Sequence, residues 1–304
     1  MRTGIVLVTF NRLDDLKKTL EAYEEQTLKP RFVLVVDNHS TDGTDKYLSQ
    51  WTEKVSSIQH IAVILEKNLG GSGGFHRGIA EALQHSCDWI FVADDDAIPK
   101  ADMLEQLAAF ADTHEKEMKQ TAALCTSVNN QGHCSGGHRC WIKGGIFGYF
   151  EVFVPEAEYA KEFFEIDTYS FVGSMIRRRA LEKAGLPRKD FFIYHDDVEH
   201  ALRVKKTGKI LCVPSAVMYH VDNVNVHMKK ANWREYYVTR NSVITHREHF
   251  GQYAGVMRAI RRIAAGMLSF NLQKMKLIWT AIMDAFHDRC GIHAIYQPGW
   301  EPDR

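Results

Sequence analysis

The chain has 304 residues with a formal net charge of zero, and 45% of its residues are hydrophobic. This composition is typical of a folded globular protein and excludes a disordered or low-complexity chain. The charge is unevenly spread, because the first 150 residues carry 15 Lys and Arg against 20 Asp and Glu. Such an acidic half argues against a nucleic-acid-binding protein, and we expect no nucleic-acid partner.

Targeting signals are weak in this sequence. The first apolar run, residues 5–8, is too short for the core of a signal peptide. The longest uncharged stretch near the C-terminus, residues 263–273, is too short to span a bilayer. The six cysteines include no Cys-x-x-Cys pair. We therefore expect a cytoplasmic protein with reduced thiols.

The first hundred residues alternate short apolar runs with amphipathic stretches. The apolar runs are rich in β-branched residues and end in turn residues, as expected of buried parallel strands. The stretches between them place apolar residues at helical spacing. This order predicts an α/β fold with a mostly parallel central sheet flanked by helices. We predict strands over residues 5–9, 32–36, 61–65 and 89–93, and helices over residues 14–25, 44–51 and 78–85.

The pattern changes after about residue 120. Aromatic and glycine-rich segments at 141–153 and 169–177 predict strands and substrate loops rather than regular βα units. A helix is predicted over 196–206, because Gly208 follows it, and a strand is predicted over 209–213. Beyond residue 221 the chain is predicted to be helical nearly to its end.

Polar clusters follow the four predicted N-terminal strands. Because ligands bind at the carboxyl ends of parallel strands, the clusters predict one shared binding site. The clusters are Thr9-Phe10-Asn11-Arg12, Asp37-Asn38-His39-Ser40, Asn68-Leu69-Gly70-Gly71 and Asp94-Asp95-Asp96.

The last of these clusters is a run of three carboxylates, Asp94, Asp95 and Asp96. Their mutual repulsion raises their pKa values unless a cation neutralises them. Mg²⁺ and Mn²⁺ take such oxygen ligands and share them with substrate phosphates. The run therefore indicates a divalent-cation site at a nucleotide. The structural alternative is an acidic turn that caps a helix starting near Pro99.

A glycine-rich segment, residues 70–74, lies between a predicted strand and a predicted helix. Glycines there let backbone N–H groups approach a diphosphate, and the helix N-terminus adds partial positive charge. Arg77, one turn into the helix, would add a charged contact to phosphate. The alternative is a flexible loop, since the segment lacks the Gly-Lys-Ser/Thr ending of a Walker loop.

The densest acidic spot of the second half is His195-Asp196-Asp197-Val198-Glu199. Asp196 and Glu199 fit a capping box at a helix start, which would make them structural. A capping box does not use the carboxylate between them, so Asp197 is a candidate base for a substrate proton. His220 ends a later strand, where a lone histidine is usually structural.

In this order, the clusters resemble those of the inverting glycosyltransferases of family 2, which have the GT-A nucleotide-diphospho-sugar transferase fold. The resemblance covers roughly residues 3–250. It implies that Asp94 and Asp96 hold Mn²⁺ or Mg²⁺ with His220 as a further ligand, and that Asp197 is the catalytic base. The nucleotide-binding set that it implies is Thr9, Asn11, Arg12, Asp37, Asn38, Asn68, Gly71, Arg77, Asp94 and Asp95, with Asp37 recognising the base.

The acceptor side is less defined by this resemblance. The family's usual Glu before the catalytic Asp is Asp196 here, and its later Asp is Glu199, so charge is kept while reach changes. We assign both residues to substrate binding, with helix capping as the alternative. Trp141 is a candidate platform for a sugar ring, with the hydrophobic core as its alternative.

Within the family, the glycine run and Tyr236-Tyr237-x-x-Arg240-Asn241 are most similar to galactofuranosyltransferases and rhamnosyltransferases. This implies a UDP-sugar or dTDP-sugar donor and a cell-surface polysaccharide or glycolipid acceptor. The domain organisation that follows is a catalytic domain over 1–225, divided at residue 120 into nucleotide-binding and acceptor-binding halves, and a helical region over 226–304.

Two other functions compete with this interpretation. A sugar nucleotidyltransferase shares a similar nucleotide-binding half, but its signature has glycine after the first strand, where this chain has Thr9-Phe10-Asn11-Arg12. An inactive carbohydrate-binding module has no need to retain Asp94, Asp96, Asp197 and His220 together.

Residues 251–283 contain five basic residues and no acidic one. Arg258, Arg261 and Arg262 are among them, with apolar residues nearby. This composition predicts a basic amphipathic helix on the inner face of the cell membrane. The alternative is a helical pair that packs on the catalytic domain or on a second subunit.

Overall fold

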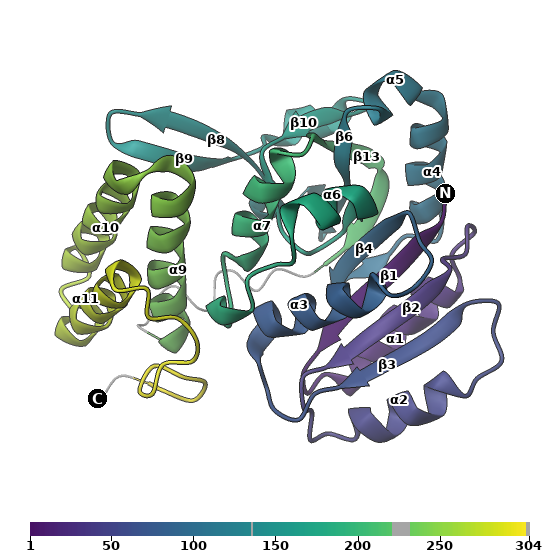
Figure 1. Ribbon diagram of the computed structural model, residues 1–304, viewed down its shortest axis with the longest axis horizontal. Helices are drawn as coiled ribbons and strands as arrows, with labels where there is room; N and C mark the ends of the chain where they lie inside the picture. The colour runs from purple at the N-terminus through teal and green to yellow at the C-terminus, as the bar shows by residue number, and fades with distance from the viewer. Residues whose placement is uncertain (135, 221–231, 302–304) are drawn as a thin grey trace.

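The computed structural model describes residues 1–134, 136–220 and 232–301. Its centre is a ten-stranded mixed sheet, beside which lie a three-stranded sheet and a bundle of C-terminal helices (Figure 1). The α/β fold predicted from the sequence, with a mostly parallel sheet, flanking helices and a helical extension, is confirmed.

The N-terminal part alternates strands with helices as predicted. Its four strands run parallel in the order β4-β1-β2-β3. The third predicted strand differs in one respect, because β3 forms the sheet edge and is only half-buried rather than enclosed on both faces. The elements are β1 (Thr3–Thr9), α1 (Leu13–Glu24), β2 (Phe32–Asp37), α2 (Thr44–Thr52), β3 (Gln59–Ile64), α3 (Gly70–Ala82) and β4 (Trp89–Asp94).

The central strands are apolar on both faces because each face of the sheet is covered. In β1, Ile5 and Leu7 point into the core under α1, α2 and α4 (Met103–Thr113). Val6 and Val8 alternate with them and point into the core under α3, α6 (Arg178–Ala184) and α7 (Asp196–Lys205). Continuous apolar strands of this kind require helices on both sides.

The middle part of the chain extends the sheet with mixed strand directions. β12 (Ser174–Arg177) lies antiparallel between β4 and β6 (Thr121–Asn130), and β13 (Lys209–Tyr219) runs parallel to β6. This explains the mixed pattern in the sequence after residue 120. The remaining elements are β5 (Ile98–Pro99), α5 (Glu115–Met118), β7 (His133–Cys134), β8 (Arg139–Gly145), β9 (Gly148–Phe153), β10 (Phe164–Ile166) and β11 (Thr168–Tyr169), of which β8, β9 and β11 form the second sheet.

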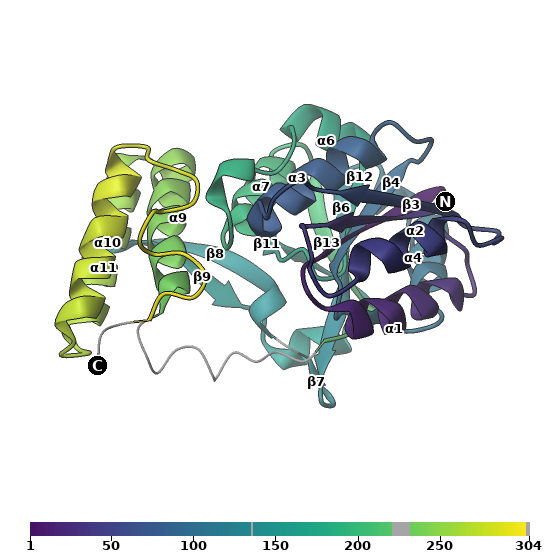
Figure 2. The same cartoon turned by 90° about the horizontal axis from the view of Figure 1, so that it is seen from below.

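Three C-terminal helices pack around a third core: α9 (Trp233–Phe250), α10 (Gln252–Met267) and α11 (Leu272–Phe286). The bundle lies at the opposite end of the molecule from α1 and α2 (Figures 1 and 2). The core also takes in Phe191 and Phe192, which precede α7. The predicted domain boundary at 225/226 lies outside the described residues. Within the described ranges, no helix combines the length and the apolarity needed to cross a lipid bilayer.

The arginines of α10 face the protein interior. Arg258 and Arg262 donate from their Nε atoms to the hydroxyls of Ser242 and Thr239 on α9, at 3.1 and 3.0 Å. Arg261 donates to a backbone carbonyl of β9 at 2.8 Å. The prediction that these side chains form an outward basic face is therefore wrong, because α9 and β9 supply acceptors that hold them inward.

Candidate active site

The ends of three parallel strands bring together polar residues that lie far apart in the sequence. Thr9 at the end of β1 is in register with Asp37 at the end of β2. Asp94, at the end of β4, is in register with Val8. The sheet thus places these side chains along one edge, as the polar clusters predicted.

A cavity of about 370 Å³ opens at this edge. Seven of the ten residues predicted to bind the nucleotide line it, which supports a single shared site. Its remaining walls come from β1, the start of α3, the segment before α7, the start of α9, and the segment after α11. The seven are Thr9, Arg12, Asn38, Asn68, Gly71, Asp94 and Asp95.

Asn11 and Arg77 do not line that cavity. The side-chain oxygen of Asn11 accepts from the backbone N–H of Thr41 at 2.7 Å, which joins the loops after β1 and β2. Arg77 reaches along α3 to Glu81, with 2.6 Å between Nη1 and Oε2. Both side chains are thus engaged in contacts within the protein.

Asp37 is fully buried beside the cavity. Its Oδ1 accepts from the backbone N–H of Ser40 at 3.0 Å, whereas Oδ2 is enclosed without a hydrogen-bond partner among the described residues. Burial raises the pKa of this carboxyl above its usual range. An enclosed acceptor without a donor is a feature that the N–H edge of a pyrimidine base can satisfy.

Two asparagines fix the start of α3. Asn38 donates to the carbonyl of Gly70 at 2.7 Å and accepts from the N–H of Leu69 at 2.9 Å. Asn68 accepts from the N–H of Gly70 at 2.7 Å. These bonds tie the end of β2 to the first turn of α3, where Gly70 and Gly71 line the cavity. The N–H groups of Gly70 and Ser72 already have acceptors, Asn68 Oδ1 and the carbonyl of Phe192.

The glycine run forms the first turns of α3 rather than a loop, which corrects the sequence prediction of a helix over 78–85 alone. A Cβ on Gly74 would come within 2.5 Å of Val8, and one on Gly70 within 2.0 Å of the carbonyl oxygen of Phe192. These glycines therefore let α3 pack closely on the sheet. Only open space surrounds Gly71, which lines the cavity and leaves room there for a phosphate.

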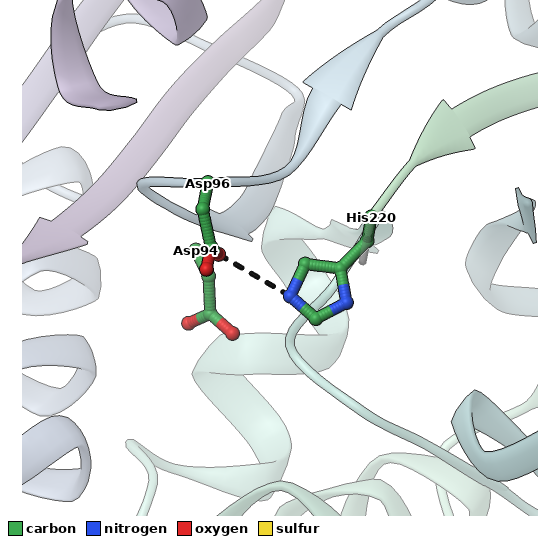
Figure 3. A group of neighbouring side chains, drawn as sticks. All are labelled: Asp94, Asp96 and His220. Atoms are coloured by element: carbon green, nitrogen blue, oxygen red, sulfur yellow. Dashed lines mark ion pairs between the residues drawn. The ribbon is translucent and has the colours of Figure 1, made fainter. Parts of the chain in front are cut away.

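Asp94, Asp96 and His220 form a potential metal site (Figure 3). One ligand atom from each lies within 4.8 Å of the others, and Nε2 of His220 is 3.2 Å from Oδ1 of Asp96. Two carboxylates and an imidazole are suitable ligands for Mn²⁺ and also for Mg²⁺. Sequence alone placed His220 in this group only through the family resemblance.

Burial and neighbouring charges set the pKa values of the acidic run. Burial, reinforced by the charge of Asp96, raises the pKa of Asp94 to about 6. Burial raises the pKa of Asp95 to about 7, although Arg12 offsets part of this. For Asp96, burial is outweighed by the hydrogen bond from His220 and the charge of Arg12, so its pKa is lowered. A bound divalent cation would stabilise the ionised form of Asp94.

A second cavity of about 420 Å³ adjoins the first and contains Asp196 and Asp197. It also contains Asp94, Asp96 and His220, so the metal ligands and the predicted base face one space. Burial, with the charges of Glu151 and Asp94, raises the pKa of Asp197 to about 7. Burial and its neighbour Asp197 raise the pKa of Asp196 well above its usual range. Trp141 lies elsewhere, with Nε1 donating to the carbonyl of Glu165 at 2.9 Å.

The predicted capping box is absent at the start of α7. The residue at the N-cap position is His195, and its side chain makes no capping hydrogen bond. Glu199 turns away and forms an ion pair with Arg203 at 2.8 Å and a contact with Nε2 of His249 at 3.1 Å. Glu199 is therefore structural, while Asp196 is freed from the capping role and lines the acceptor-side cavity.

The turn that delivers Asp196 and Asp197 has an unusual backbone. Phe192, Tyr194 and His195 all have φ between 64° and 67°, a region that non-glycine residues rarely occupy. The side-chain N–H₂ of Asn241 on α9 holds the turn by donating to three of its carbonyls at 2.9–3.0 Å. Such strain persists only where surrounding contacts enforce it.

The C-terminal region also contributes residues that sequence reasoning did not assign, from the start of α9 and from the segment after α11. Trp233, Arg234 and Pro298 line the first cavity, and Arg234 lines the second as well. The guanidinium of Arg234 stacks on the ring of Trp233 at 4.7 Å from its centroid. By contrast, Arg12 already contacts Asp95 and Asp96. No sequence motif predicts that Arg234 lines the cavities, because its position depends on the packing of α9 near the edge of the sheet.

Comparison with known proteins agrees with this architecture. Residues 4–185 match the family described as Glycosyl transferase family 2. Galactofuranosyltransferase GlfT1 of Mycobacterium tuberculosis (strain CDC 1551 / Oshkosh) is 29% identical over 206 residues, which cover 67% of this chain and 64% of that protein. The matched region thus spans slightly less than two-thirds of the relative's length.

Solved structures share the fold at low sequence identity. S. aureus TarS 1-349 in complex with UDP-GlcNAc has a TM-score of 0.61 at 17% identity, covering 94% of this chain and 81% of that one. GalNAc-T7 with UDP, GalNAc and Mn²⁺ has a TM-score of 0.63 at 13% identity, covering 92% and 55%. Since the family match extends over more than half of the sequence, the chain belongs to glycosyl transferase family 2 and has the GT-A fold.

Proposed function

We propose that the chain transfers a sugar from a nucleotide diphosphate donor to an acceptor hydroxyl, with inversion at the anomeric carbon. The main support for this proposal is the position of the two cavities. The cavity lined by the nucleotide-loop residues and the cavity that contains Asp197 meet at Asp94, so a donor and an acceptor can approach the same point. Asp94, Asp96 and His220 lie at that junction.

The donor's position follows from the first cavity. The enclosed, unpaired Oδ2 of Asp37 would accept from the N–H edge of the base, and the diphosphate would lie beside Gly71 near the N-terminus of α3. Asp94, Asp96 and His220 would hold Mn²⁺ or Mg²⁺, which supplies positive charge that neutralises the departing diphosphate. Arg234, free of any carboxylate partner among the described residues, adds a second cation on the same side.

Transfer is a single displacement. The acceptor oxygen bonds to the anomeric carbon as the bond from that carbon to the diphosphate oxygen breaks, and the diphosphate leaves with the electron pair. Asp197 takes the proton of the attacking hydroxyl. Its raised pKa makes it a stronger base than an ordinary aspartate while it remains ionised at neutral pH in part.

For substrates we propose a UDP-sugar donor, with a dTDP-sugar as the alternative, and a cell-surface polysaccharide or glycolipid acceptor. The similarity to galactofuranosyltransferase GlfT1 supports UDP-galactofuranose as the first donor to test. We further propose a cytoplasmic location, at the inner face of the membrane. The nucleotide-binding half is assigned to residues 1–120, the acceptor-binding half to 121–225, and the helical region to 226–304.

Asp197→Asn tests the assignment of the base. The amide keeps the size of the side chain but has no useful basicity, so turnover at saturating donor should fall about 10²–10⁴-fold with UDP affinity nearly unchanged. Asp196→Asn is the neighbouring comparison and should be less damaging. If Asp197→Asn keeps near wild-type turnover, the base lies elsewhere and Asp196 becomes the candidate.

A further inference from the structure

The helical hairpin α10–α11 exposes an unusual amount of apolar surface. Nine of the 21 exposed large apolar side chains in the described parts of the chain lie on it. We call this set the apolar outer face. Its members are Tyr253, Val256, Ile260, Met267, Leu268, Phe270, Leu272, Trp279 and Met283.

The spacing of these residues shows that they share one side of each helix. Positions 253, 256, 260 and 267 are spaced by three, four and seven residues, which places them on one face of α10. Positions 272, 279 and 283 lie on one face of α11 for the same reason. The opposite sides pack on α9 through buried residues such as Ala259 and Ile278. Both helices lie at the outer end of the molecule (Figures 1 and 2). Apart from the hydroxyl of Tyr253, which donates to the carbonyl of Ile146, the apolar outer face is exposed within the described part of the chain.

The turn between the two helices, taken together with Leu272 at the start of α11, is its most exposed part. Leu268, Phe270 and Leu272 are 79%, 96% and 87% exposed. Phe270 also has φ of 49°, a conformation in which glycine or asparagine is usual at the end of a helix. Neither core packing nor backbone preference explains a bulky aromatic residue with so exposed a side chain in this conformation.

Such a surface could bind a second copy of the chain or a lipid bilayer, and its charge favours the bilayer. Residues 251–283 contain no Asp or Glu, and Lys276 is exposed among the apolar side chains. A second copy of the chain would bring the same surface and no carboxylate to pair with Lys276. An anionic bilayer provides both apolar depth for a protruding turn and negative charge at its surface.

We propose that the apolar outer face binds an anionic lipid bilayer, with the turn that carries Leu268, Phe270 and Leu272 inserting between lipids. This differs from the arginine-rich face predicted from the sequence, since the arginines of α10 point inward. The contact is independent of the transfer reaction, because none of these residues lines either cavity.

The test is sedimentation of the full chain with vesicles of phosphatidylcholine alone and of equimolar phosphatidylcholine and phosphatidylglycerol. The wild type should bind the anionic vesicles more strongly. Leu268→Gln with Phe270→Gln should lower the partition coefficient at least tenfold, because two exposed apolar side chains lose their gain from leaving water. The matched control is Val55→Gln with Ile64→Gln, which changes two exposed apolar residues of the nucleotide-binding half and should bind like the wild type.

Thermal unfolding and UDP binding of both double variants check that each is folded. The proposal is overturned if the wild type stays in the supernatant with both vesicle types, or if the two double variants bind equally well. Light scattering gives the remaining outcome. A wild-type dimer that the Leu268 and Phe270 changes dissociate, without vesicle binding, would assign the face to a second copy instead.

Discussion

Asn241 on α9 donates to three carbonyls of the acidic turn, beside one bond from Arg240, and we predict that it positions this turn for catalysis. Asn241→Asp tests this coupling. The substitution keeps the size of the side chain and the acceptor for Nε of Arg240, 2.9 Å from Oδ1. It replaces the donating N–H₂ by a second carboxylate oxygen. That oxygen would face the carbonyls of Phe191, Ile193 and Tyr194 at about the distances that the amide nitrogen has now.

The magnitude follows from the bonds that are lost. An N–H₂ group makes at most two full hydrogen bonds, each contributing about 1 kcal/mol net. The carbonyl of Phe191 keeps Arg240 Nη2 as a donor at 3.0 Å. The carbonyls of Ile193 and Tyr194 lose the amide donor and face a negatively charged oxygen, which brings the loss in free energy of unfolding to about 3 kcal/mol. The variant should remain folded at 25 °C, since a domain of this kind has roughly 5–15 kcal/mol available. The turn relaxes, however, and a displacement of about 1 Å at Asp197 costs on the order of 10²-fold in turnover.

The assay measures turnover and UDP affinity well below the midpoint of thermal unfolding. A residue with a purely structural role would lower the midpoint and leave turnover per folded molecule unchanged, whereas a positioning residue lowers turnover itself. Asn271→Asp is the matched control, because Asn271 accepts from Lys274 N–H as an N-cap and Asp serves equally well there. Full turnover in folded Asn241→Asp would refute the proposed coupling.

Two further predictions concern charge in the active site. Arg234→Gln should lower turnover about 10–100-fold, because a charged hydrogen bond contributes about 1.5–3 kcal/mol. Arg289→Gln changes an exposed arginine and should have no effect on turnover. Equal activity of the two variants would show that Arg234 does not act in the site. A base whose pKa is raised to about 7 is mostly protonated and inactive below that value. The value of kcat/KM should therefore rise with pH, reach half its maximum near pH 7, or somewhat lower once a divalent cation is bound, and level off above that midpoint. An ordinary aspartate, with a pKa near 4, would give a value of kcat/KM that is almost constant from pH 5 to 8, and such a profile would contradict the raised pKa of Asp197.

Much of the nucleotide-binding half was predictable because its signals are local. Each strand is a continuous apolar run, and parallel strands bring their carboxyl ends to one edge, so Thr9, Asp37 and Asp94 could be grouped without a structure. The helix boundary at α3 was missed because glycine has low helix propensity. Close packing of Gly74 on Val8 overrides that propensity, and packing of this kind is invisible in a single segment.

Residues that act across long sequence distances could not be predicted in the same way. The capping box at Asp196 and Glu199 is a valid local pattern, but His249 lies 50 positions away and captures Glu199. The arginines of α10 read as an outward basic face until α9 provides their acceptors. The place of Arg234 in the cavity could not be predicted for the same reason, since only the folded chain brings α9 to the sheet edge.

The account depends most directly on a metal-dependent nucleotide site formed by Asp94, Asp96 and His220. The decisive measurement is calorimetric affinity for UDP with Mn²⁺ and again with excess EDTA, on the wild type and on His220→Ala. The account predicts measurable binding with Mn²⁺, loss of most of that affinity under EDTA, and a weakened Mn²⁺ effect in His220→Ala. Equal UDP affinity in both conditions would contradict it.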